Sequence, residues 1–408
     1  MGKLDSSFVA DTGLEYAINL LRDVPIKADD LPVSFPDFGM GEISTLEILA
    51  PHVLGRAAPL DTPCALAHMD PPTPWITWAT ALWNARLNQN LLHRATAPFA
   101  IEAEKKVVDW LTPFFGMNGG HMCSGSTIAN LTALWAARDT KGITRVVASE
   151  AAHLSIKKAA RILGLVYEEM PTNTYGQLDP GKLVDISDAC LVLTAGTTAT
   201  GEIDPLELAG QAKWTHIDAA WAGPLRLSPT HAHLLEGIEN ADSVSVSAHK
   251  WLFQPKDSAL IMFRESESAN SAISFGGGYL VTPNIGVQGS RGAAAIPLLA
   301  TLIAWGRTGL VDRIDRAMSV SASLAAHISK MENMYLWAEP KTGVTVFRPT
   351  GCDTEDFYRR LPEGMLSTCI IQKQNWLRSV AANPLANIES IISNIQEVSR
   401  GNNTEQGV

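Results

Sequence analysis

Short apolar segments alternate with segments of helical periodicity through the middle of this 408-residue chain. Apolar runs of strand length stand at residues 145–149, 190–195, 214–218, 244–247 and 259–263. Apolar residues at helical spacing predict helices at residues 100–115, 154–163 and 206–213. Alternation of apolar strands with helices is typical of a parallel sheet that is covered on both faces. The pattern therefore predicts an α/β fold with a mostly parallel sheet.

The two ends of the chain follow other patterns. Residues 1–60 include a proline-rich stretch with room for one or two short helices, which indicates an N-terminal arm. The C-terminal part is predicted to contain helices at 293–307 and 311–331, strands at 344–347 and 365–371, and a helix from residue 387. We therefore expect an arm at 1–60, a large α/β domain at 61–310 and a small α+β domain at 311–408.

Charge and hydropathy argue against several classes of partner. The formal net charge is −10, so a nucleic-acid surface of clustered lysine and arginine is not expected. The longest apolar run, residues 292–306, is too short to span a bilayer and is edged by Arg291 and Arg307, which indicates a buried helix. The N-terminus has no apolar leader segment. We expect a cytoplasmic protein without a membrane or nucleic-acid partner.

The five cysteines are odd in number and show no paired spacing. This pattern is typical of free thiols in a reducing compartment, so neither disulfides nor a metal site is expected. Cys123 stands just before a predicted helix N-terminus, where a thiolate nucleophile can be activated. The alternative, an inert small residue near a ligand, is the favoured interpretation of Cys123.

Polar residues stand at the carboxyl ends of several predicted strands, where ligands bind in open α/β sheets. They are Ser149 with His153 beyond it, Thr197 and Thr198, Asp218, and Ser247 with His249 and Lys250. Lysine is rarely buried unless something pairs with it, so Lys250 beside a buried strand needs an explanation. Four strand ends that present a histidine, threonines, an aspartate and a lysine indicate a binding site.

The chemistry of this set converges on pyridoxal phosphate as cofactor. A lysine amine bonds to the aldehyde of that cofactor, and a carboxylate pairs with its protonated pyridine nitrogen. An aromatic group can cover the ring, and a helix N-terminus with small hydroxyl residues can bind the phosphate. Lys250, Asp218 and His153 supply the first three parts. The fourth part is a predicted helix start formed by Gly125, Ser126 and Thr127.

Two motifs carry a family resemblance, 215-THIDAAWAG-223 and 247-SAHKW-251. With them, the chain resembles the group II pyridoxal-phosphate-dependent amino-acid decarboxylases. Further segments agree in the same order, among them 87-LNQNLLHRATAPFAIEAEKKVVDWL-111, 124-SGSTIANLTALWAAR-138, 149-SEAAHLSIKKAARILGL-165, 196-GTTATGEIDPL-206, 344-VTVFRP-349 and 376-WLRSVAANP-384. The resemblance covers roughly residues 60–400.

The resemblance implies fold type I of pyridoxal-phosphate enzymes and a homodimer with active sites at the interface. Lys250 matches the Schiff-base lysine, Asp218 the pyridinium partner, His153 the ring-stacking histidine and Ala220 the small residue on the other face. Other matches lie near the cofactor: Gly125, Ser126, Thr127, Thr198 or Thr197, Ser247, His249 and Arg291. The substrate-facing matches are His68, Asp70 and Arg378. Two prolines after Asp70 also allow a purely structural turn there.

The chain departs from the family in a short segment between Arg264 and Arg291. Decarboxylases of this family carry a longer mobile loop there, with a tyrosine that delivers a proton. Tyr279 follows three glycines and either supplies that proton or only marks the start of the loop.

The leading hypothesis is decarboxylation of an amino acid to its amine. The alternatives are an aminotransferase, a lyase or an aldehyde-forming enzyme on the same fold, and a catalytically silent scaffold. The sequence does not name the substrate.

Overall fold

The computed structural model describes residues 12–24, 27 and 29–405. The chain forms two compact units, Met1–Pro59 and Leu60–Val408. The described part of the first unit contains helices α1 (Thr12–Arg22) and α2 (Glu42–Val53). A hydrogen bond from the Tyr16 hydroxyl to Glu47 Oε1, 3.0 Å long, joins these two helices.

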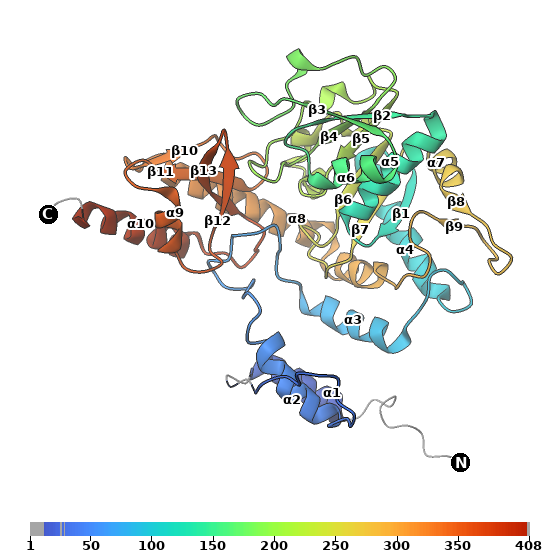
Figure 1. The fold of residues 1–408 in the computed structure, drawn as a ribbon, viewed down its shortest axis with the longest axis horizontal. Coiled ribbons are helices and arrows are strands. Elements are labelled where there is room, and N and C mark those ends of the chain that lie inside the picture. The colour runs from blue at the N-terminus through green and yellow to red at the C-terminus, as the bar shows by residue number, and fades with distance from the viewer. Residues whose placement is uncertain (1–11, 25–26, 28, 406–408) are drawn as a thin grey trace. The chain divides into compact units, whose positions relative to one another are not determined.

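The second unit is built on a seven-stranded sheet in the order β1-β7-β6-β5-β4-β2-β3 (Figure 1). The strands are β1 (Gly119–Cys123), β2 (Arg145–Ser149), β3 (Val166–Met170), β4 (Cys190–Thr194), β5 (Trp214–Asp218), β6 (Ser243–Ser247) and β7 (Ala259–Phe263). Strand β7 is antiparallel to both of its neighbours, and the pairs from β6 to β3 are parallel. The predicted α/β fold with a mostly parallel sheet is confirmed.

Helices cover both faces of this sheet because its central strands are apolar on both sides. Helices α5 (Ser126–Lys141) and α6 (Leu154–Ile162) pack on the face that includes Val192 and Phe263. Helices α4 (Pro98–Leu111) and α8 (Ala295–Ile328) belong to the core on the other face, with Leu193 and Met262. Adjacent residues of one strand thus enter opposite cores, as the two-residue period of a strand requires.

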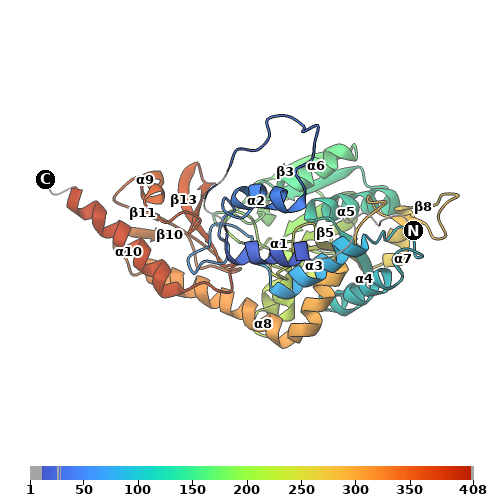
Figure 2. The same cartoon turned by 90° about the horizontal axis from the view of Figure 1, so that it is seen from below.

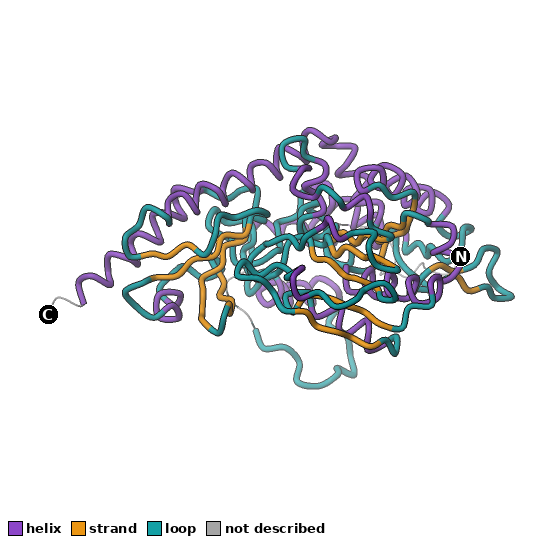
Figure 3. Tube along the Cα trace, turned by 90° about the horizontal axis from the view of Figure 1, so that it is seen from above, coloured by secondary structure: helices purple, strands orange, loops and turns teal. Residues whose placement is uncertain are grey.

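The C-terminal part forms an antiparallel four-stranded sheet in the order β10-β11-β13-β12. Its elements are β10 (Met334–Leu336), β11 (Val344–Pro349), α9 (Thr354–Arg359), β12 (Ser367–Ile371), β13 (Gln374–Val380) and α10 (Ile388–Glu405). Helix α8 runs from the large sheet to this smaller one (Figures 2 and 3). It bends at Gly306, which has φ 61° and ψ −177°. The predicted domain boundary at residue 310 lies inside α8 and stays a prediction.

The remaining elements connect these layers. Helix α3 (Trp75–Leu87) packs along α8, and α7 (Ser266–Ala272) packs against α5. Strands β8 (Ser274–Phe275) and β9 (Asn284–Ile285) pair as a small hairpin at the edge of the large sheet (Figure 1). Among the described residues, none of the helices is long and apolar enough to cross a membrane.

Three elements differ from the prediction. Residues 206–213 form only a 3₁₀ turn at Leu206–Leu208, because Gly210 at φ 82° stops the chain from continuing as a helix. Strand β1 (Gly119–Cys123) was not among the predicted strands. A Cβ on its Gly120 would lie 2.0 Å from the carbonyl oxygen of Ile261, so glycine here permits close approach to β7. Strand β3 lies at the edge of the sheet. Its polar and apolar residues do not alternate clearly, so the sequence did not predict it as a strand.

Candidate active site

One cavity gathers residues from the carboxyl ends of several parallel strands. Its lining comprises Met69, Ser126, His153, Thr194, Gly196, Thr198, Asp218, Ala220, Trp221 and Lys250. Six of these were predicted from the sequence as site residues: Ser126, His153, Thr198, Asp218, Ala220 and Lys250. Strands β4 and β5 end at Thr194 and Asp218, and the turn after β6 carries Lys250. The structure therefore brings together one predicted residue from each of four strand ends, His153, Thr198, Asp218 and Lys250, whereas Ser149, Thr197, Ser247 and His249 do not line this cavity.

Lys250 lies in a turn beside two indoles that pack on each other with an angle of 34° between their planes. The next residue, Trp251, is buried and packs on Trp221 with 4.2 Å between ring centroids. Trp251 Nε1 donates to the carbonyl of Ala381 over 3.2 Å, and Trp221 Nε1 donates to that of Thr342 over 2.7 Å. Burial lowers the pKa of Lys250, against the opposing effect of nearby carboxylates. The amine is therefore closer to its neutral, nucleophilic form.

Asp218 ends β5 with its carboxylate buried and held by several donors. The backbone N–H of Ala220 donates to Oδ1 over 3.1 Å. Asn130 Nδ2 donates to Oδ2 over 2.8 Å, whereas the Ser245 hydroxyl, 3.4 Å from Oδ1, gives its one proton to Asn130 Oδ1 over 2.7 Å. These contacts hold the Asp218 carboxylate in one orientation, so the lone pairs that are not used in these bonds have a fixed direction.

His153 precedes α6 and caps the first turn of that helix. Its Nδ1 accepts from the backbone N–H of Ser155 over 3.3 Å and lies 2.8 Å from the Ser155 hydroxyl. Partial burial lowers the pKa of His153, and the Lys250 charge lowers it further, while Asp218 raises it. The imidazole is therefore neutral at pH 7. Its flat ring lines the cavity.

The N-terminus of α5 forms a cradle that suits a phosphate group. Gly125 caps the helix at φ 96°, and Ser126 and Thr127 are its first two residues, so the helix starts where the sequence predicted it. A Cβ on Gly125 would meet only His249, at 3.8 Å, so the space in front of the helix is open. The buried hydroxyl of Ser247 has no hydrogen-bond partner. Backbone N–H groups, a helix dipole and a spare hydroxyl are what a bound phosphate requires.

The residues that are present fit pyridoxal phosphate. An amine, a carboxylate, a flat neutral ring and a phosphate cradle converge, and the unpartnered Thr194 hydroxyl adds a further polar group. Burial lowers the pKa of His249, next to Lys250, to about 4, so this side chain is neutral as well. When bound, pyridoxal phosphate withdraws the electron pair that a departing carboxyl group leaves on the substrate.

The two threonines after β4 point in different directions. Thr198 lines the cavity. The Thr197 hydroxyl instead lies 2.8 Å from the Thr200 hydroxyl and accepts from the backbone N–H of Glu202 over 3.1 Å. Of the two alternatives, Thr198 is thus the residue that is available to a ligand.

Arg378 reaches the site from the smaller sheet. Its Nη1 donates to the carbonyl of Thr198 over 2.9 Å, and its Nη2 donates to that of Ala67 over 3.3 Å. Its Nε is buried without a partner. Burial lowers the pKa of Arg378, but arginine is not deprotonated in proteins, so the side chain is a cation beside the cavity with an unused N–H.

The other two predicted substrate residues lie beside the cavity. Met69 lines it, whereas its neighbour His68 is exposed. Asp70 pairs with Lys256, six residues after Lys250 in the sequence. The Asp70 carboxylate is therefore already occupied by a cation in this structure.

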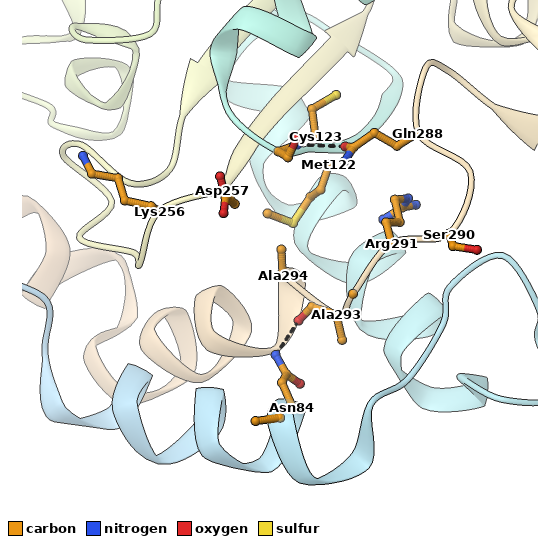
Figure 4. Close-up of a pocket in the computed structure, with 13 residues that line it drawn as sticks. Asn84, Met122, Cys123, Lys256, Asp257, Gln288, Ser290, Arg291, Ala293 and Ala294 are labelled. Atoms are coloured by element: carbon orange, nitrogen blue, oxygen red, sulfur yellow. Dashed lines mark hydrogen bonds between the residues drawn. The ribbon is translucent and has the colours of Figure 1, made fainter. Parts of the chain in front are cut away.

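A separate pocket contains Arg291 and Cys123 (Figure 4). Arg291 forms an ion pair with Glu104, with its Nη2 2.7 Å from Oε1. Gln288 accepts from the backbone N–H of Ser124 over 2.9 Å, which links this pocket to the segment before α5. Burial raises the pKa of Cys123 to about 12, so its thiol is inert. The favoured interpretation of Cys123 therefore agrees with its environment, and a contact of Arg291 with the cofactor stays a prediction.

Tyr279 lies apart from this cavity. It stands between β8 and β9, 74% exposed, with its ring centroid 6.4 Å from that of His93. The residues that line the cavity around Lys250 do not include it. Within one chain, the structure does not bring Tyr279 to Lys250.

Sequence reasoning missed the polar residues behind the cavity, chiefly Asn130, Ser155, His216 and Ser245. All four are buried. One signal was present in the chain: Ser243, Ser245 and Ser247 alternate with valines in β6, a strand that is buried along its whole length. Buried hydroxyls need partners, so such a strand predicts a polar network on one face.

Comparisons with known proteins agree with this geometry. The pyridoxal-dependent decarboxylase conserved domain matches residues 60–350. An aspartate 1-decarboxylase of Aliivibrio fischeri is 29% identical over 412 residues, covering 83% of this chain and 75% of the relative. An L-2,4-diaminobutyrate decarboxylase of Acinetobacter baumannii is 29% identical, covering 78% and 73%. The crystal structure of Oryza sativa TDC with PLP and tryptamine has a TM-score of 0.88 at 19% identity and covers 99% of each chain, which shows the shared fold.

The fold and the cavity define a pyridoxal-phosphate enzyme of the α/β class. The chain belongs to the pyridoxal-dependent decarboxylase family. It is a carboxy-lyase that acts on an amino acid with pyridoxal phosphate as cofactor. The family, cofactor and reaction class predicted from the sequence are confirmed.

Proposed function

We propose that the enzyme decarboxylates an amino acid to its amine, with Lys250 as the residue that holds the cofactor. Its Nζ would bond to the aldehyde carbon of the cofactor with loss of water. Asp218 would pair with the protonated pyridine nitrogen, and His153 and Ala220 would cover the two faces of the ring. One observation carries this proposal: Lys250, Asp218 and His153 come from three separate segments and line the same cavity.

Substrate binding would fall to residues at the edge of the cavity. Arg378 has a buried N–H without a partner, and a substrate carboxylate is the natural acceptor for it. His68 and Asp70 flank Met69 and are our candidates for contacts with the substrate side chain. Asp70 would have to leave Lys256 to make such a contact.

We assign the final proton transfer to Tyr279 of a second copy of the chain. The exposed position of Tyr279 supports this assignment, because a residue outside its own cavity is free to serve a neighbouring one. Helix α3 supports a homodimer, since Trp75, Trp78 and Trp83 are 70%, 56% and 60% exposed. Three exposed indoles on one helix form an apolar patch of the kind that subunits bury. The free cysteines support a reducing compartment, the cytoplasm.

A second candidate function is formation of an aldehyde after decarboxylation. The separation of Tyr279 from the cavity favours it, because without a proton donor the amine is not the only product. A phenylacetaldehyde synthase of Petunia hybrida is 33% identical over 44% of this chain.

Product analysis and lysine mapping test these proposals together. The purified enzyme is incubated with the twenty amino acids, diaminobutyrate and cysteine sulfinate, and mass spectrometry distinguishes amine from aldehyde and keto acid. Borohydride treatment of the cofactor-loaded enzyme should leave a stable adduct on Lys250, located by peptide mapping. Lys256→Ala is the matched control, because it removes the other lysine of the same turn and should keep the adduct. An adduct on any other lysine would refute the role of Lys250.

A further inference from the structure

A continuous chain of hydrogen bonds runs behind the cavity and joins Asp218 to His153. Its members in order are Trp214, Ser243, His216, Asn130, Ser155 and His153, with branches from Asn130 to Asp218 and Ser245. Asn130 lies at the branch point and has no exposed surface. All four hydrogen-bonding positions of its amide are therefore occupied by side chains of other elements.

The direction of each bond around Asn130 follows from the groups that can only accept or only donate. The Asp218 carboxylate only accepts, so the amide nitrogen of Asn130 must face it, at 2.8 Å. The same nitrogen donates to the Ser155 hydroxyl over 2.9 Å. His153 Nδ1 accepts from the backbone N–H of Ser155 over 3.3 Å, so it is unprotonated and also accepts the proton of the Ser155 hydroxyl, at 2.8 Å. His153 therefore carries its proton on Nε2.

The other half of the chain agrees with this orientation of Asn130. The indole N–H of Trp214 only donates, and it reaches the Ser243 oxygen over 3.0 Å. Because Asn130 Oδ1 can only accept, the His216 proton lies on Nε2, and His216 Nδ1 is left to accept from the Ser243 hydroxyl over 3.0 Å. That proton faces Asn130 Oδ1 at 3.0 Å, and Ser245 donates to the same oxygen over 2.7 Å.

We propose that Asn130 is a positioning residue that sets the Asp218 carboxylate and the His153 tautomer at once. The inference rests on the proposed function, in which these two groups hold the cofactor ring. One amide on α5 thereby couples the end of β5 to the start of α6. Because the network is complete in the chain alone, both groups are oriented before the cofactor binds.

Replacement by aspartate is the sharpest perturbation, because it keeps the shape and removes the donors. A carboxylate at residue 130 would face the Asp218 carboxylate, and two such groups in contact must share a proton. Ser155 would turn its proton toward the new carboxylate and away from His153. Asn130→Ala removes the same donors without adding a charge. A hydrogen bond to a charged group is worth enough for cofactor affinity to fall by roughly tenfold to a hundredfold in either variant.

The test combines nitrogen NMR of ¹⁵N-histidine-labelled protein with titration of pyridoxal phosphate. In the wild type, the unprotonated ring nitrogen of His153 should be Nδ1, with the shift of a nitrogen that accepts a hydrogen bond. In Asn130→Asp, this signal should move toward that of a free acceptor, and cofactor affinity should fall at least about tenfold. Thr132→Val is the matched control. It changes an equally buried residue of α5 whose hydroxyl donates to the Ile128 carbonyl of its own helix, at 2.7 Å, and also interacts with the Cys123 thiol.

Two results would overturn the inference. One is a wild-type His153 that carries its proton on Nδ1. The other is an Asn130→Ala variant that binds the cofactor with wild-type affinity. If Asn130→Asp does not fold, the affinity of Asn130→Ala is sufficient to test the inference. A loss of affinity in Thr132→Val equal to that in Asn130→Ala would count against it as well, because the effect would then be general to α5. None of these signals depends on turnover, so the release of carbon dioxide by the wild type tests the proposed function separately.

Discussion

Replacing Asp218 by asparagine removes one charge from the site and keeps its shape. The carboxylate accepts from the Ala220 N–H at one oxygen and from Asn130 Nδ2 at the other. Whichever oxygen becomes an NH₂ group then faces a donor, so one buried N–H loses its acceptor at a cost of about 1–3 kcal/mol. The larger expected effect is the loss of the anion that, in our proposal, pairs with the pyridine nitrogen. Removing one preorganised electrostatic contact from an active site lowers the rate by about 10²–10³-fold, and we expect turnover of Asp218→Asn to fall by the same factor.

The assay for Asp218→Asn is steady-state amine formation, measured beside the thermal unfolding midpoint. Asp204→Asn is the matched control, because Asp204 is also buried and accepts from the backbone N–H groups of Leu178 and Thr194 over 2.7 and 2.8 Å. Asp204→Asn should lower the unfolding midpoint and leave turnover within a few fold of wild type. If Asp218→Asn turns over at more than a tenth of the wild-type rate, the carboxylate does not hold the ring proton and our assignment fails.

Three further predictions follow from the site and its surroundings. Tyr279→Phe should shift the product from amine toward aldehyde, because it removes only the hydroxyl that would protonate the substrate carbon; an unchanged product ratio, measured by mass spectrometry, would make Tyr279 a plain loop residue. The double variant Trp75→Glu, Trp78→Glu should halve the mass in light scattering, whereas Trp110→Glu on α4 should not; a dimeric double variant would refute the role of α3. Lys250→Met should stabilise the cofactor-free protein at pH 7. The pKa of Lys250 is lowered by burial, so the folded chain pays to bury the charge at any pH below the ordinary value of 10.5. The gain should therefore shrink as pH rises toward 10.5 in thermal unfolding, and a gain that grows instead would contradict the burial of this amine.

Strands that are buried along their whole length could be predicted from the sequence. Strands at the edge of the sheet, and polar contacts between residues far apart in the sequence, could not. The bounds of β2 and β5 match the prediction because both are apolar runs with polar residues at their ends. Lys250, Asp218 and His153 were found because strand ends of a parallel sheet share one edge. Asn130 was not found, because its partner Asp218 is 88 residues away and nothing local in α5 marks the contact. For Tyr279 the sequence left two roles open, and the role that we propose would require a second copy of the chain.

The packed indoles of Trp221 and Trp251 connect the C-terminal part of the chain to the cavity around Lys250. Trp251 follows Lys250, Trp221 stands three residues after Asp218, and both send their N–H groups to carbonyls of the C-terminal part, at Ala381 and Thr342. None of the residues that line the cavity lies beyond Lys250 in the sequence. A chain cut before Thr342 would thus retain the whole lining and lose both anchors. The spacing between the Lys250 amine and the Asp218 carboxylate therefore depends on two hydrogen bonds to the C-terminal part of the chain.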